Sequence, residues 1–196
     1  YELAPDVNKK GRAIEIIKRQ TEQLNRLVDD LLDVTRIMRS KTTLQIEQIN
    51  LSELALMAAE AQRPLFEAKN INLVTNIPPD ISCKGDAVRI SQSISNLLHN
   101  ASKFCGEGDT TWISVFMQGN EAVVSVRDNG IGISETNLES LFEPFTQVDN
   151  TLDRQKGGLG LGLSIVKGMI ELHGGHVSAA SEGLGKGSEF RIYLPL

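Results

Sequence analysis

The sequence predicts an α+β domain that follows one long helix of a helical bundle. Strand-like and helix-like stretches alternate from residue 42 to residue 196. Two pairs of the strand-like stretches are joined by Gly-containing turns, which indicates antiparallel hairpins. Residues 1–10 show little pattern, and residues 11–41 carry a helical repeat of apolar residues. We therefore expect a partial bundle helix over residues 1–41 and a second domain over residues 42–196.

Composition limits the class of protein and its partners. The 196 residues are 40% hydrophobic and carry a net charge of −5, with 20 basic and 25 acidic side chains and no basic block, which argues against nucleic acid as a partner. An acidic protein can still bind a polyphosphate if backbone amides and Mg²⁺ supply the positive potential. Cys83 and Cys105, the only cysteines, are expected to be reduced and buried. We expect a cytoplasmic domain; any membrane segment of its parent would lie outside this sequence, which starts at Tyr1.

The first helix shows a heptad seam within residues 11–41. Its seam residues alternate three and four apart: Ile14, Ile17, Thr21, Leu24, Val28, Leu31, Thr35 and Met38. Neighbouring apolar residues widen the stripe beyond that of a two-stranded coiled coil: Leu27, Leu32, Val34 and Ile37. A stripe of this width suits a helical bundle whose other helices come from another segment, a second copy, or both. The alternative is a core helix that packs on its own domain.

The second domain divides into alternating elements. Predicted strands cover residues 44–46, 71–76, 81–84, 110–117, 122–127, 176–181 and 188–194. Predicted helices cover residues 51–69, 86–104, 134–141 and 159–173, with Asn50 and Ser134 as N-caps and Gly174-Gly175 as a stop. Residues 146–158 are polar and read as a mobile loop.

The helix predicted over residues 86–104 carries polar residues opposite its apolar face. At about 100° per residue, Asn96, Asn100 and Lys103 fall together, with Phe104 at their edge. An Asn carbonyl suits Mg²⁺ carried in on phosphates, Lys is a point charge for a phosphate, and Phe offers a flat face to a purine. The alternative is a solvated helix face, and this helix alone does not decide between the two.

Two further stretches suggest a nucleotide. Asp128 ends a strand in Asp128-Asn-Gly-Ile-Gly132, where its carboxylate could accept from an exocyclic amine and select adenine, or simply form an Asx-turn. Gly157, Gly158, Gly160 and Gly162 lead into a helix, and a glycine loop at a helix N-terminus is a phosphate site or merely a flexible loop. Between them, Phe142-Glu-Pro-Phe145 reads as a core plug or as the hinge of the polar loop.

Four blocks in this order resemble the N, G1, F and G2 boxes of sensor histidine kinases, within the wider family of gyrase-, Hsp90- and MutL-type ATPases. They are residues 96–104, 128–132, 141–145 and 157–162, and the likeness extends over residues 12–196. The resemblance implies an α/β sandwich in which a mixed, mostly antiparallel sheet is covered by helices on one face. It also implies that ATP lies between helix and loop, and that the first helix is the second helix of a dimerisation and phosphotransfer bundle.

The resemblance assigns roles to residues of this sequence. Asn100 would hold Mg²⁺, while Asn96 and Lys103 would act at the phosphates, with Arg154 of the lid 146–158 as a further phosphate contact. Around the nucleotide it implies Phe104 near the adenine, Asp128 on the adenine amine, Gly130 and Gly132 in the adjoining wall, and Gly158, Leu159, Gly160, Leu161 and Gly162 at the phosphates.

Two departures from the family pattern shape the expected activity. The acceptor-histidine motif of the first bundle helix is missing, and His99, His173 and His176 are not expected to replace it. Asn96 stands where hydrolytic relatives have a Glu base, and an amide cannot take a proton from water, so hydrolysis should be slow.

The implied function is γ-phosphate transfer from MgATP to a histidine on an absent bundle helix, for relay to a response-regulator receiver domain by a full-length homodimer. The alternatives are a nucleotide-sensing or protein-binding module and a gyrase-type ATPase.

Overall fold

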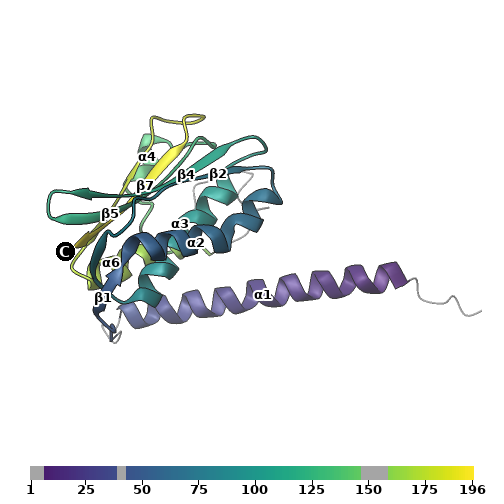
Figure 1. The fold of residues 1–196 in the computed structure, drawn as a ribbon. Helices are drawn as coiled ribbons and strands as arrows, with labels where there is room; N and C mark the ends of the chain where they lie inside the picture. Colours follow the sequence, from purple (N-terminus) through teal and green to yellow (C-terminus); the bar gives the residue numbers. More distant parts are fainter. Residues whose placement is uncertain (1–6, 39–42, 147–158) are drawn as a thin grey trace, which may run out of the picture.

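The computed structural model describes residues 7–38, 43–146 and 159–196 (Figure 1). Its first helix, α1 (Val7–Met38), extends well beyond the α/β part of the molecule. Among the described residues, no helix is both long and apolar enough to cross a membrane.

The main sheet has five strands in the order β2-β4-β5-β7-β6. The strands are β2 (Asn72–Asn76), β4 (Thr110–Gln118), β5 (Glu121–Asp128), β6 (His176–Ala180) and β7 (Ser188–Pro195). Only β2 and β4 pair in parallel; every other neighbouring pair is antiparallel. The mixed, mostly antiparallel sheet and both predicted hairpins are therefore confirmed.

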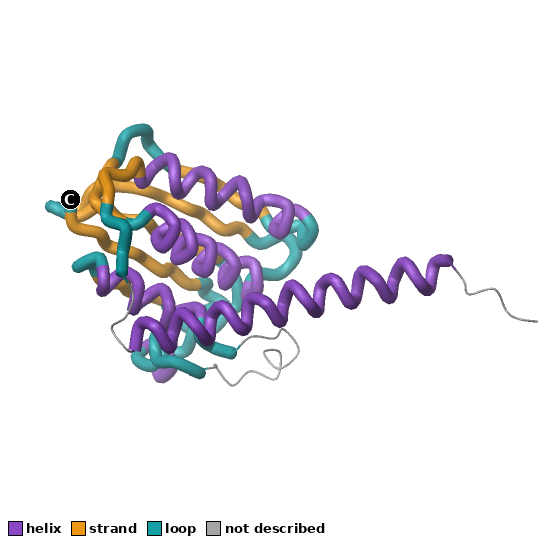
Figure 2. The backbone as a smooth tube through the Cα atoms, turned by 90° about the horizontal axis from the view of Figure 1, so that it is seen from below, coloured by secondary structure: helices purple, strands orange, loops and turns teal. Residues whose placement is uncertain are grey.

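Three helices lie side by side on one face of this sheet, as Figures 1 and 2 show. They are α2 (Leu51–Glu67), α3 (Ala87–Phe104) and α6 (Gly162–Leu172). Asn50 caps α2 as predicted, because its side-chain oxygen accepts from Glu53 N at 3.1 Å. The apolar core fills the space between the sheet and these helices and includes the fully buried Phe66, Ile113 and Ile192.

Two predicted elements differ from the structure. The strand predicted over residues 44–46 is wrong: β1 is Glu47–Asn50, and it pairs with β3 (Ser82–Gly85) in a separate two-stranded sheet. Burial explains the shift, because Ile49 is buried in the core whereas Ile46 is 52% exposed. The helix predicted through residue 141 is also shorter, since α4 is only Glu135–Leu138 and the Ser134 side chain makes no capping bond. The chain turns after α4, which brings Leu141 into the core.

A second, smaller core joins α1 to α6. Val34 and Ile37 near the end of α1 pack against Leu161, Ile165 and Met169. A polar contact lies beside it, because the buried Asp33 accepts from Arg89 Nη1 at 3.2 Å and from Gln92 Nε2 at 2.7 Å. The last turns of α1 thus pack on α6 and α3, while Ile14, Ile17, Leu24 and Val28 earlier in the helix are exposed.

Candidate functional site

The helix that carries most of the predicted site, α3, is fixed firmly at its beginning. Asp86 caps it, because its Oδ1 accepts from the backbone N–H groups of Val88 and Arg89 and its Oδ2 accepts from that of Gln45. Burial alone would raise the pKa of Asp86, but these three backbone donors outweigh it and the pKa is lowered. The backbone N–H of Asp86 donates in turn to Nε2 of His173 at 3.0 Å.

The last turn of α3 is fixed from two sides. Lys69, just after α2, donates from Nζ to the carbonyl oxygen of Ser102 at 2.6 Å. Ile131, in the loop after β5, donates from its backbone N–H to the carbonyl oxygen of Phe104 at 3.2 Å. The end of α3 therefore has a defined position relative to both α2 and the Asp128 loop.

The predicted polar face of α3 exists as expected. Asn96, Asn100, Lys103 and Phe104 are all half-buried, and the Lys103 ammonium lies 4.6 Å from the centroid of the Phe104 ring. The Nδ2 atom of Asn96 is buried and has no hydrogen-bond partner in the part of the chain that the structure describes. A buried donor of this kind is costly unless a ligand supplies the acceptor.

Asp128 ends β5 and is only 4% exposed. Its Oδ1 accepts from Gly130 N at 2.9 Å and its Oδ2 accepts from Ser188 Oγ at 2.6 Å. Burial raises the pKa of Asp128, and these donors offset the rise only in part. The bond to Gly130 is an Asx-type turn, so the structural interpretation is confirmed; the carboxylate still has lone pairs for a further donor.

Glycines around this loop allow backbones to approach closely. A Cβ on Gly130 would lie 2.5 Å from the carbonyl oxygen of Phe104. Gly132 has φ +68°, and a Cβ there would collide with the carbonyl oxygen of Gly183. Both glycines therefore hold the Asp128 loop against α3 and against the loop between β6 and β7.

The glycine-rich stretch is described only from residue 159 onward. Gly160 has φ +71°, and a Cβ there would lie 2.5 Å from the carbonyl oxygen of Thr146, whereas a Cβ on Gly162, the first residue of α6, would meet no described residue within 4 Å. Leu159 is 40% exposed, but the Leu161 side chain is buried in the small core, so Leu161 offers a ligand only its backbone. The predicted site residues Arg154 and Gly158 lie outside the described residues.

The two phenylalanines of the Phe142–Phe145 motif lie in different surroundings. Phe142 packs edge-on against Phe190, with ring centroids 6.4 Å apart, and so acts as a core plug. Phe145 is instead 61% exposed and adopts φ +63°, at the border of residues 147–158.

His173, His176 and both cysteines make contacts within the fold. His173 is buried, with Nδ1 2.6 Å from the carbonyl oxygen of Met169, so its two ring nitrogens connect α6 to the start of α3. His176 stacks on Tyr193 with centroids 4.2 Å apart. Cys83 and Cys105 are free and buried, as predicted, and burial raises the pKa of each thiol to about 11.

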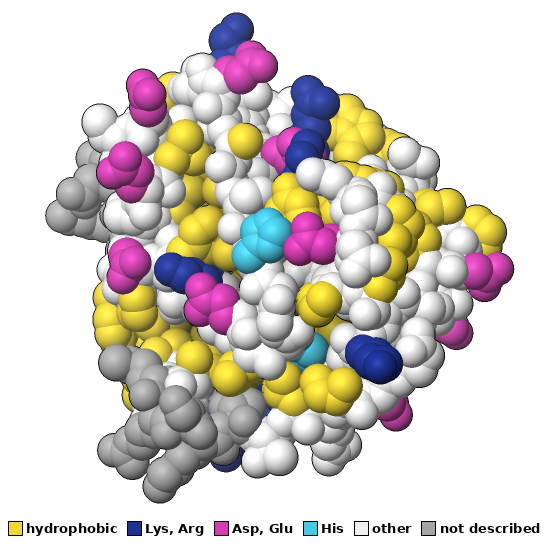
Figure 3. Space-filling view, turned by 90° about the vertical axis from the view of Figure 1, so that its left-hand side faces the viewer, with side chains coloured by type: hydrophobic (Ala, Val, Ile, Leu, Met, Phe, Trp, Pro, Cys, Tyr) yellow, Lys and Arg dark blue, Asp and Glu magenta, His cyan; other side chains and the backbone are white. Residues whose placement is uncertain are grey.

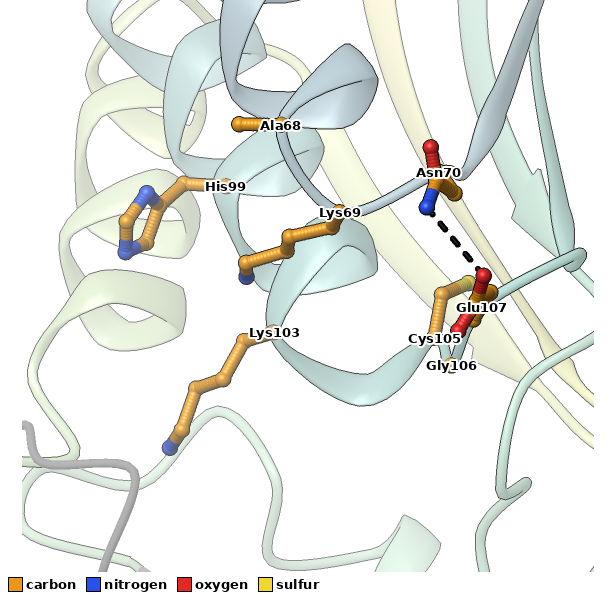
Figure 4. A pocket seen from close by; sticks show the side chains of 8 residues that line it. All are labelled: Ala68, Lys69, Asn70, His99, Lys103, Cys105, Gly106 and Glu107. Carbon is orange, nitrogen blue, oxygen red and sulfur yellow. Dashed lines mark hydrogen bonds between the residues drawn. The ribbon is translucent and has the colours of Figure 1, made fainter.

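Sequence reasoning missed Lys69, which lines a cavity of about 580 Å³ together with His99 and Lys103 (Figure 4). No sequence signal joins Lys69 to the site, because it reaches α3 only through the packing of α2 against α3.

The described residues contain no preformed cluster of metal-ligating side chains. No group of three or more His, Cys, Asp or Glu side chains there is arranged to hold a metal ion. On the face drawn in Figure 3, basic and acidic side chains are scattered among one another, and the basic ones form no continuous patch.

Several known proteins resemble this chain in sequence. Residues 85–196 match the family described as histidine kinase-, DNA gyrase B- and HSP90-like ATPase. The circadian input-output histidine kinase CikA of Synechococcus elongatus is 33% identical over 100% of this chain and 26% of its own length. The sensor histidine kinase GacS of Pseudomonas protegens is 36% identical over 92% of this chain and 20% of its own length. The chain thus spans only about a quarter of the length of such relatives.

Solved structures show the same fold. The full-length structure of ShkA in complex with AMPPNP aligns with a TM-score of 0.80 and 26% identity, over 100% of this chain and 40% of that one. The histidine kinase AdeS of Acinetobacter baumannii aligns with a TM-score of 0.77 over 98% of this chain and 86% of that one, at 22% identity.

Proposed function

Because this chain belongs to the histidine kinase-, DNA gyrase B- and HSP90-like ATPase family, we propose that it is the ATP-binding catalytic domain of a sensor histidine kinase. In this proposal it transfers the γ-phosphate of MgATP to a histidine on a bundle helix outside this sequence. Membership of the family implies nucleotide use, and the relatives above are sensor histidine kinases. The acceptor helix, the response regulator and the homodimer belong to the proposal.

The buried amide of Asn96 is the observation that carries the proposal. Its Nδ2, which has no hydrogen-bond partner among the described residues, lies on the α3 face that also carries Asn100 and Lys103. A phosphate oxygen would supply the missing acceptor, and an amide at this position cannot deprotonate water. This chemistry favours holding a phosphate for transfer over hydrolysing it.

The other residues of the face fit a nucleotide. The Asp128 carboxylate can accept from the adenine amine, and the half-buried Phe104 can pack on the ring. Lys103 can donate to a phosphate, and no described residue lies within 4 Å of a Cβ built on Gly162, so a phosphate could approach the N-terminus of α6. Mg²⁺ held by the Asn100 carbonyl oxygen would supply charge neutralisation at the phosphates.

Calorimetric titration of the chain with ATP, with and without Mg²⁺, tests the binding part of the proposal. Wild type should bind ATP more tightly with Mg²⁺, and Asn100→Ala should lose that dependence. Asn76→Ala is the matched control, because Asn76 is exposed on β2 and should leave both titrations unchanged. No binding by wild type would instead favour the protein-binding module.

Labelled ATP supplied with a separate bundle that carries both helices tests transfer. The proposal expects label on the bundle histidine and little free phosphate from the chain alone. Steady phosphate release without the bundle would favour the gyrase-type ATPase. Tight binding without any labelling of the bundle would favour a nucleotide sensor.

A further inference from the structure

Basic side chains gather in the cavity where the C-terminal ends of α2 and α3 meet. Lys69 follows α2, Lys103 lies in the last turn of α3, and His99 lies one turn earlier. In Figure 4 these three side chains extend toward the same side of α3. Asn70 and Glu107 lie on the other side, where Asn70 Nδ2 donates to Glu107 Oε1 at 3.1 Å. The Glu107 carboxylate is thus engaged by Asn70.

Helix geometry relates this cavity to the nucleotide face of α3. At about 100° per residue, the face from His99 to Phe104 spans an arc of roughly 140°. His99 lies at one edge of the arc and Phe104 at the other, with Asn96, Asn100 and Lys103 between them. A nucleotide whose base lies at Phe104 and Asp128 would direct its phosphates across the arc, toward the cavity edge.

Lys69 is held in place at that edge. Its ammonium donates to the carbonyl oxygen of Ser102 at 2.6 Å, and the Ser102 side chain is itself fully buried. This bond fixes the position of a positive charge that comes from α2 rather than from any of the four sequence blocks. A charge held in a fixed position loses less entropy on binding a phosphate than one on a freely rotating side chain.

We propose that Lys69 and His99 bind the terminal phosphate of a nucleoside triphosphate whose inner phosphates lie at Lys103. The cavity then distinguishes a triphosphate from a diphosphate. This inference rests on the proposed function and adds a phosphate contact from α2 to it.

Titrations with MgATP and MgADP test the inference through the ratio of the two affinities. Lys69→Gln should lower the affinity for ATP by about fivefold and leave that for ADP almost unchanged, as expected for one partly exposed ionic contact. Lys69→Arg, which keeps the charge, should restore most of the ratio. Lys84→Gln is the matched control, because it removes an exposed lysine on β3 and should change neither affinity.

An equal loss for ATP and ADP in Lys69→Gln would overturn the inference, because it would mean that Lys69 only positions α3 through Ser102. If Lys69→Gln does not fold, His99→Ala carries the test, since His99 is exposed and should be dispensable for folding. It should lower the ratio of ATP to ADP affinity by roughly twofold, and an unchanged ratio would overturn the inference. Failure of wild type to bind either nucleotide would refute the proposed function itself.

Discussion

At the scale of single residues, burial and hydrogen bonds act in opposite directions on the pKa of Asp128. Its carboxyl group is 4% exposed, and burial raises its pKa above the usual value despite bonds from Ser188 and Gly130. Above that raised pKa the carboxylate is ionised and accepts only. Below that pKa, one carboxyl oxygen carries a proton, and this oxygen can no longer accept a hydrogen bond from an amine in the same way. Adenine recognition should therefore depend on pH.

We predict that adenosine binds more weakly as the pH falls through the raised pKa of Asp128. The folded protein holds this proton more tightly than the unfolded chain does, so Asp128 contributes less to the free energy of unfolding as the pH rises through the same window. Asp128→Asn should weaken adenosine binding by about tenfold and flatten the pH dependence of both binding and unfolding. Calorimetry and urea titrations at several pH values measure these two effects.

Asp80→Asn is the control for this prediction, since Asp80 is exposed in a turn. It should keep the pH profile of wild type. A profile of adenosine affinity that Asp128→Asn leaves unaltered would remove Asp128 from the base site.

At the scale of elements, the proposed function places the phosphates at the N-terminus of α6, where the glycine-rich stretch ends. Gly162 is the first residue of α6, and a Cβ there would meet no atom of the described residues within 4 Å, so we expect alanine to fit the fold. The same methyl group would occupy the space through which a phosphate reaches the N–H groups of α6. Folding and binding should therefore respond differently to one substitution.

We predict that Gly162→Ala keeps or raises the free energy of unfolding, by up to about 1 kcal/mol, and weakens ATP binding at least about tenfold. Gly11→Ala in α1 is the matched control, since a Cβ there also meets nothing within 4 Å. It should show the stability change alone. Unchanged ATP affinity in Gly162→Ala would mean that phosphates do not approach α6. Urea unfolding and calorimetry provide the two measurements.

Sequence reasoning succeeded for elements whose signals are local. The Asn50 cap and the β4–β5 hairpin depend on residues within a few positions of one another, and both are confirmed. It failed for β1, because the alternation at residues 44–46 is outweighed by the burial of Ile49 against β3, a contact about 35 residues away in sequence. The local sequence signals also did not specify the parallel pairing of β2 with β4, because that pairing joins residues far apart in the sequence.

The same distinction between local and long-range signals applies to the candidate site. The polar face of α3 follows from helical spacing within one element, so Asn96, Asn100 and Lys103 could be grouped from the sequence. Lys69 could not be, because its approach to Ser102 depends on how two helices pack. The bond between His173 and the backbone of Asp86 likewise joins residues 87 positions apart.

At the scale of the whole molecule, α1 leaves an apolar seam uncovered. Only its last turns pack on α6, through Val34 and Ile37. Earlier seam residues remain largely exposed: Ile14 is 65% exposed, Ile17 63%, Leu24 60%, Val28 49% and Leu31 48%. A seam of this length on a monomer is unfavourable in water, so we expect a second copy to cover it, in agreement with the proposed homodimer.

Sedimentation equilibrium of the chain should therefore show a dimer that dissociates on dilution. Leu24→Glu should weaken the dimer by at least about 100-fold, because a symmetric pair carries the lost apolar burial and the added charge twice. Met57→Glu changes an equally exposed side chain on α2, 61% exposed, and should leave the dimer intact. A wild-type monomer at high concentration would contradict the expectation. A dimer that Leu24→Glu leaves intact would locate the contact away from α1, and the seam would then require another helix instead of a second copy.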